Sequence, residues 1–194
     1  MAYLSSKQLS RMGFRSIGEN VLISEKASIY GAARISIGSH VRIDDFCILS
    51  AGQKGIRIGD YIHIACYTSL IGKETISLAD FVNLSSRVAI YSSSDDYSGN
   101  FMTNPMVSAE YTNVDHRPVI LNKHCIVGAG AVILPGVTLG KGCAVGAFSL
   151  VSHDCAPFCT YVGIPAKKIK LRNRRLLKVE TLFRIRRNPA GANA

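Results

Sequence analysis

An aliphatic residue recurs at every sixth position through most of this chain. In the stretch "VGAGAVILPGVTLGKGCAVGAFSLV" the spacing joins Val127, Ile133, Leu139, Val145 and Val151. Neither a helical period nor a simple strand alternation has this spacing. We call this spacing of aliphatic residues the six-residue beat. It also links earlier positions, in blocks that begin at Ile17, Ile37 and Ile58, and it resumes at Leu121 after a gap over residues 91–118.

The beat indicates a chain that turns a corner every six residues. Three such sides close a coil of about 18 residues, and stacked coils bury their aliphatic residues in one continuous column. Small residues such as Ala131, Cys143 and Ser149 suit the tight corners. The alternative is an ordinary all-β sandwich, whose strands recur less regularly, at about 8–12 residues. The regular spacing favours an all-β fold in the form of a parallel β-helix of hexapeptide repeats.

Length and composition fit one domain with a sizeable core. The chain has 194 residues, and 47% of them are hydrophobic. No apolar run is long enough to span a membrane, and the start, "MAYLSSKQLSRMGF", lacks the apolar stretch of a secretory signal. A cytoplasmic protein is therefore expected. The six cysteines form no CxxC pair and are expected to be small buried thiols.

Positive charge is concentrated near the C-terminus. The net charge is +10, and residues 167–187 hold ten Lys or Arg and one acid, Glu180. Such a segment can meet phosphates, nucleic acid or an anionic membrane in peripheral contact, or it can be a solvated helix face. Phe183 is its single aromatic residue, so it lacks the interleaved aromatic residues that stack on bases, and no nucleic-acid partner is expected. Ile169, Leu176, Val179 and Phe183 approximate a helical stripe and predict a short basic helix and tail over residues 171–194.

The segment "VGAGAVILPGVTLGKGCAVGAFSLVSHDCAPFCTYVGIPAKKIK" resembles the last coils of sugar, galactoside and maltose acetyltransferases. These are hexapeptide-repeat acyltransferases, and the resemblance covers residues 17 to about 170. It implies a left-handed parallel β-helix as domain 1–170, a homotrimer, and acetyl-coenzyme A bound between coils of neighbouring subunits. The acceptor would be an amino or hydroxyl group of a sugar, either nucleotide-linked or part of a surface polysaccharide. "SDDYSG" resembles a subgroup associated with surface-polysaccharide, including lipopolysaccharide, biosynthesis.

The resemblance also implies positions for the cosubstrate. Lys167 and Lys168 would hold its phosphates as point charges. The pantetheine arm would follow small corner residues, although the glycines among them can also serve the turn alone. These corner residues are Gly128, Ala129, Gly146 and Ala147.

Residues 91–118 interrupt the beat as a long polar loop, ejected from one coil and expected to close the acceptor site. The resembling enzymes place a catalytic histidine where this loop begins, and here Asp95 stands there. A hydroxyl acceptor needs a positioned base, whereas an amine needs less help and can be oriented by a carboxylate. Each candidate also has a plain structural interpretation, as a turn, corner or surface residue. The candidate catalytic residues are Asp95, Asp96, His63, His116 and His124.

Two other functions use the same fold. One is a non-catalytic β-helix scaffold. The other is a gamma-type carbonic anhydrase, which needs three histidines around a metal across a subunit interface. His116 and His124 are eight residues apart and lack acid-rich surroundings, so no metal site is predicted.

Overall fold

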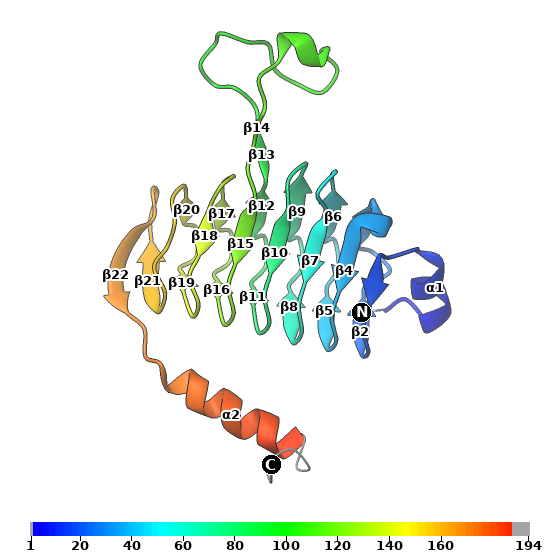
Figure 1. Cartoon of the computed structure of the whole chain (residues 1–194), viewed down its shortest axis with the longest axis vertical. Helices are drawn as coiled ribbons and strands as arrows, with labels where there is room; N and C mark the ends of the chain where they lie inside the picture. The colour runs from blue at the N-terminus through cyan, green and yellow to red at the C-terminus, as the bar shows by residue number, and fades with distance from the viewer. Residues whose placement is uncertain (1, 188–194) are drawn as a thin grey trace.

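The structure, a computed structural model that describes residues 2–187, is a stack of three-stranded coils (Figure 1). Each full coil adds one short strand to each of three sheets, and within the stack the strands pair in parallel with the coils before and after them. The predicted parallel β-helix is confirmed.

The three sheets form the sides of the stack. Sheet 1 contains β1 (Ser16–Ile17), β4 (Ile35–Ile37), β7 (Ile56–Ile58), β10 (Ile76–Leu78), β15 (Val119–Leu121) and β18 (Thr138–Leu139). Sheet 2 contains β2 (Val21–Ile23), β5 (Val41–Ile43), β8 (Ile62–Ile64), β11 (Asn83–Leu84), β16 (Ile126–Val127), β19 (Ala144–Val145), β21 (Cys159–Val162) and β22 (Lys167–Leu171). Sheet 3 contains β3 (Ser28–Tyr30), β6 (Ile48–Ala51), β9 (Ser69–Gly72), β12 (Ala89–Tyr91), β17 (Val132–Ile133) and β20 (Leu150–Val151).

The remaining elements lie outside these three sides. β13 (Ser93–Ser94) and β14 (Asp115–His116) pair with each other in the ejected loop, which also holds the 3-10 turn η2 (Ala109–Tyr111). The turn η1 (Ala32–Arg34) lies at an early corner. The helices are α1 (Ser6–Arg11) and α2 (Arg175–Arg187). The part of the predicted tail that follows Arg187 lies outside the described residues.

The residues of the six-residue beat form the core. From Ile35 to Val151 every one of them is buried, whereas Ile17, in the first coil, keeps 37% of its surface exposed. Stacked aliphatics from successive coils therefore supply the main hydrophobic stabilisation, as expected for a solenoid.

The register differs from the predicted one at one corner. Ile76 continues the count from Leu70, but it pairs with Ile56, while Leu78 pairs with Ile58. The uninterrupted beat thus conceals a two-residue shift before β10. Before the ejected loop, paired residues are 20 or 21 apart, because the corners are longer there. After the loop they are 18 apart, and 16 apart between β19 and β21.

Stacked rings line the corner between sheets 1 and 2. His40, Tyr61, Phe81 and His124 each have a positive φ and succeed one another along the stack, and their ring centroids are separated by 4.7, 4.9 and 5.0 Å. A positive φ is unfavourable for such residues. Face-to-face contact between neighbouring rings offsets part of that cost. We call these four residues the ring ladder.

The C-terminal segment turns back along this corner. β22 pairs antiparallel with β21, and α2 then runs lengthwise beside the ring ladder (Figure 1). The helix prediction needs a correction, because Ile169 lies in β22 and the helix begins only at Arg175. The strand extends the sheet for five residues before the chain can turn. Within residues 2–187, the helices are too short and too polar to cross a membrane.

All six cysteines are free thiols, as predicted for a chain without a disulfide framework. Five are buried, and Cys66 is half-buried.

Candidate functional site

The ejected loop leaves the stack at the corner between sheets 3 and 1, after β12. Its two strands pair antiparallel, with Ser93 opposite His116 and Ser94 opposite Asp115. Figure 1 shows this stem and the rest of the loop projecting away from the coils. The loop therefore has an ordered base, and its first residues are held at a fixed place on the stack.

Hydrogen bonds fix the base of the stem. The buried Ser92 donates from Oγ to the Glu74 carbonyl at 2.7 Å, and Ser93 Oγ accepts from the Lys73 N–H at 2.8 Å. On the returning strand, Arg117 donates to both oxygens of Asp115. The Arg117 side chain also lies against Gly136, where a Cβ would come within 2.9 Å of its guanidinium.

A cavity of about 360 Å³ lies where the stem meets the next coil. One wall comes from β12 and the loop, and the other from β17 and the residues that follow it. Its lining combines hydroxyls and a carboxylate with apolar side chains: Tyr91, Ser93, Ser94, Asp95, Tyr97, Val132, Leu134 and Pro135.

Asp95 and Asp96 differ sharply in this structure. Asp96 accepts hydrogen bonds from the Ser98 N–H and from Asn113 Nδ2. These bonds, those from Ser98 first, lower the pKa of Asp96. The Asp95 carboxylate lines the cavity and accepts no hydrogen bond from residues 2–187. Asp96 therefore stabilises a turn of the loop, while the Asp95 carboxylate is available to a bound molecule.

His116 lies directly behind the cavity lining. Its Nδ1 shares a hydrogen bond of 2.8 Å with Ser93 Oγ, and Ser93 itself lines the cavity. The neighbouring Asp115 pairs with Arg117 rather than with the imidazole. In a single chain His116 is thus placed to orient Ser93.

His63 belongs to a different side of the stack. It lies on β8 in sheet 2, opposite the corner from which the loop projects. Its Nε2 is 2.8 Å from Asp44, which also accepts from Arg42 at 2.7 Å. Burial alone would raise the pKa of Asp44, but the hydrogen bonds from His63 and Arg42 outweigh it and lower the pKa. Within one chain His63 and Asp95 are not brought together.

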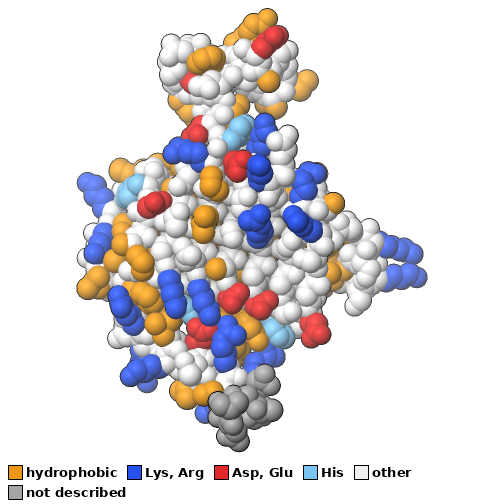
Figure 2. All heavy atoms as spheres, viewed as in Figure 1, with side chains coloured by type: hydrophobic (Ala, Val, Ile, Leu, Met, Phe, Trp, Pro, Cys, Tyr) orange, Lys and Arg blue, Asp and Glu red, His pale blue; other side chains and the backbone are white. Residues whose placement is uncertain are grey.

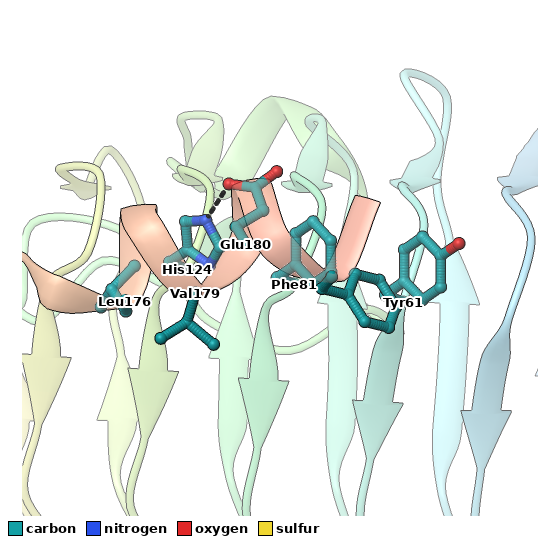
Figure 3. A pocket seen from close by; sticks show the side chains of 7 residues that line it. Tyr61, Phe81, His124, Leu176, Val179 and Glu180 are labelled. Carbon is teal, nitrogen blue, oxygen red and sulfur yellow. Dashed lines mark hydrogen bonds and ion pairs between the residues drawn. The ribbon is translucent and has the colours of Figure 1, made fainter. Parts of the chain in front are cut away.

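His124 is the last member of the ring ladder and is covered by α2 (Figure 3). Its Nε2 is 2.7 Å from Glu180, and only 11% of its side chain is exposed. The corner between sheets 1 and 2 that it occupies does not carry the loop. The structure therefore gives His124 a packing partner and does not bring it to the Asp95 cavity.

The predicted cosubstrate residues lie at the corner between sheets 2 and 3. A Cβ on Gly128 would come within 2.5 Å of the Ala147 nitrogen, and a Cβ on Gly146 within 2.5 Å of Val162. Both glycines are thus required by the close stacking of coils. Ala147 is exposed and Ala129 half-buried. β17 runs from this corner toward the cavity, since Ala129 precedes it and Leu134 and Pro135 follow it.

Lys167 and Lys168 are both exposed on β22, beyond the last coil. They lie at the same end of the stack as Gly146 and Ala147, because β22 pairs with β21 and β21 with β19.

Sequence reasoning missed part of the cavity. Tyr91, Tyr97 and Pro135 were not expected to line it, and Arg117 was not expected to brace the stem. A signal was present, because Tyr91 ends the coil before the interruption and Pro135 follows the third strand of the beat after it. Stacking those coils places the two segments side by side.

This fold and cavity define a hexapeptide-repeat transferase, and comparison with known proteins agrees. The family "Bacterial transferase hexapeptide (six repeats)" matches residues 118–153. A dTDP-4-amino-4,6-dideoxy-D-glucose acyltransferase of Escherichia coli is 55% identical over 184 residues, covering 95% of this chain and 96% of the relative. AntD, an N-acyltransferase from Bacillus cereus, was solved in complex with dTDP and 3-hydroxybutyryl-CoA. It is 48% identical with a TM-score of 0.93, covering 96% of this chain and 98% of AntD.

A variant of AntD was also solved with dTDP-4-amino-4,6-dideoxyglucose and coenzyme A. It has a TM-score of 0.90 and 48% identity, and covers 93% of this chain and 96% of its own. The chain belongs to the hexapeptide-repeat acyltransferase family. The predictions of this family, of a sugar acyltransferase and of a coenzyme A thioester as cosubstrate are confirmed.

Proposed function

We propose that this enzyme transfers an acyl group from acyl-coenzyme A to the 4-amino group of a dTDP-linked 4-amino-4,6-dideoxy sugar. The carboxylate of Asp95 is the observation that carries the proposal. It lines a cavity of about 360 Å³ without a hydrogen-bond donor of its own among residues 2–187. A carboxylate in this setting suits an amino group, which arrives with protons to donate.

The proposed reaction forms an amide and breaks a thioester. The sugar enters with its amine protonated or neutral, and Asp95 orients the amine and accepts the proton that it must lose. The free nitrogen lone pair attacks the thioester carbonyl. Collapse of the tetrahedral intermediate expels the coenzyme A thiolate, and the proton that the attacking nitrogen then releases passes to the sulfur, so that coenzyme A leaves as the thiol. Tyr91, Tyr97 and Pro135 offer apolar surface for the deoxy face of the sugar.

We propose that the cosubstrate lies in a groove between two subunits of a homotrimer. Asp95 lies at one edge of sheet 3 and Ala147 at the other, so a groove that uses both is naturally completed by two copies. Ala129 and Ala147 then face the pantetheine arm, with Gly128 and Gly146 permitting the tight corner. Lys167 and Lys168 hold the phosphates.

The proposed setting is the cytoplasm, with the acylated sugar nucleotide serving as a building unit for a surface polysaccharide such as lipopolysaccharide. The "SDDYSG" motif at the loop base and the nucleotide sugar named for the E. coli relative support this assignment.

The test is release of coenzyme A thiol by the purified protein, together with the mass of the sugar product. The acceptors compared are dTDP-4-amino-4,6-dideoxyglucose and its 4-hydroxy counterpart, each with acetyl-CoA and with 3-hydroxybutyryl-CoA. We expect acylation of the amino sugar alone. Acylation of the hydroxy counterpart at an equal rate would refute the amine assignment, and no thiol release with either acceptor would refute the substrate class.

A further inference from the structure

α2 has an inner face fixed to the β-helix. Glu180 binds Lys123 at 2.6 Å and His124 at 2.7 Å, and Phe183 packs edge-on against Tyr61 and Phe81. Arg187 donates to the Tyr61 hydroxyl at 2.8 Å. These contacts determine which side of the helix faces away from the protein.

The opposite side carries five exposed residues that repeat mainly at intervals of three and four, and therefore share one face of the helix. Two are apolar, and Leu182 and Ile185 keep 59% and 45% of their surfaces exposed. The other three are cations. Val179 borders this face, but it lines the cavity between α2 and the ring ladder. We call the five residues the outer stripe: Arg175, Lys178, Leu182, Ile185 and Arg186.

The outer stripe contains no acid. Glu180, the single acidic residue of α2, points inward, where it pairs with Lys123 and Arg184 and contacts the His124 imidazole. The cations of the stripe form no ion pair with residues 2–187. The exposed strand β22 adds further lysines at this end of the stack, and Figure 2 shows basic and hydrophobic side chains gathered there.

We infer that the outer stripe docks the enzyme on a bilayer that carries anionic lipids. Cations interleaved with exposed aliphatic residues on one helix face suit a lipid surface, where charge attracts and the apolar side chains insert between headgroups. A second copy of the stripe would set cations against cations. A nucleic acid would leave the aliphatic residues unused. α2 lies lengthwise along the side of the stack, so its whole outer stripe can meet a flat surface (Figure 1).

The inference is tested by co-sedimentation of the full chain with vesicles. Phosphatidylcholine vesicles containing phosphatidylglycerol should bind the protein, phosphatidylcholine alone should bind it weakly, and added salt should weaken binding. Lys178→Glu combined with Arg186→Glu should lower partitioning about tenfold or more, since each cation near the surface counts for roughly a fivefold change. The matched control is Lys7→Glu combined with Lys54→Glu, two exposed lysines that lie in α1 and in an early coil. It makes the same change in net charge and should lower binding much less.

A second pair of substitutions, Leu182→Ser with Ile185→Ser, tests the apolar part and should also lower partitioning. Thermal unfolding and acyl transfer in solution should match the wild type in every variant, because these residues contact neither the ring ladder nor the Asp95 cavity. Absence of wild-type binding, an equal loss in the Lys7 and Lys54 control, or full binding by the serine variant would each overturn the inference. A stripe variant that changes the oligomeric mass would show instead that the stripe contacts another copy.

Discussion

Asp95 and Asp96 are adjacent in the chain yet have opposite environments. Both oxygens of Asp96 are occupied by donors from the loop, Ser98 and Asn113. Asp95 faces the cavity. The two positions therefore allow a matched comparison in which only one substitution should affect the chemistry.

We expect Asp95→Asn to lower kcat/KM for the amino-sugar acceptor by about 10²-fold or more, since asparagine keeps the shape but cannot accept a proton. Asp96→Asn should change kcat/KM only a few-fold and act through the stability of the turn. Steady-state kinetics of both variants measure kcat/KM, and thermal unfolding measures their stability. Equal losses in the two variants, or an unaffected Asp95→Asn, would contradict the assignment.

The sequence predicted that a carboxylate replaces the usual histidine at the loop base, but it could not choose between the two aspartates. The choice depends on Asn113, seventeen residues further along the loop, whose amide binds Asp96. The sequence also could not predict the environment of His124, because the partner of this histidine, Glu180, is 56 residues away in the chain.

The thiols give a second test at the residue scale. Burial raises the pKa of Cys47 to about 11 and that of Cys125 to about 12, so both are protonated at neutral pH and poor nucleophiles. We expect a disulfide reagent at pH 8 to modify the half-buried Cys66 first and the five buried thiols only after denaturation. Rapid reaction of several thiols in the native protein would show that the coils open locally.

At the scale of elements, α2 is held by one carboxylate, which binds Lys123, Arg184 and the His124 imidazole. Burial would raise the pKa of Glu180, but hydrogen bonds from Lys123, Arg184 and His124 prevail and lower it to about 2. Since the folded-state pKa lies below the ordinary value of 4.5, the stabilisation is present above pH 4.5 and is lost as the pH falls toward 2.

Glu180→Gln should therefore reduce the free energy of unfolding at pH 7 by about 2 kcal/mol. The difference from the wild type should shrink as the pH falls below 4.5. Denaturant unfolding across this range measures both quantities. Glu110→Gln, at an exposed loop position, is the control and should change the free energy of unfolding little at any pH. A difference that does not change with pH would mean that the helix is held by its apolar contacts alone.

The elements of the stack were largely predictable because each coil repeats the same burial pattern. The ring ladder was also encoded, since His40, Tyr61, Phe81 and His124 each follow a strand of sheet 1 by three residues. β22 was not predictable from the sequence, because its five residues are all exposed and their pattern resembles neither a buried strand nor the six-residue beat. Antiparallel pairing with β21 forms it, and that pairing depends on where the chain turns after the last coil.

At the scale of the whole molecule, the exposed surface favours assembly. The loop holds Tyr97 and Met106 at 92% exposure each, and the corner residue Phe148 keeps 72%. Apolar side chains as exposed as these are typical of surfaces that another chain covers. We expect light scattering at micromolar concentration to give three times the 21.0 kDa mass of one chain. A mass of one chain would contradict the trimer.

Mixing two inactive variants tests whether each site combines residues from two subunits. Asp95→Asn removes the carboxylate, and Ala147→Trp blocks the exposed corner proposed for the pantetheine arm. If Asp95 of one subunit serves with Ala147 of its neighbour, mixed trimers contain sites in which neither residue is altered. Random exchange of equal amounts should then restore activity at about a quarter of the sites. Coenzyme A release before and after denaturation and joint refolding measures the gain, with each variant refolded alone as the control. No gain, despite mixed trimers detected by mass, would place both residues of each site within one chain.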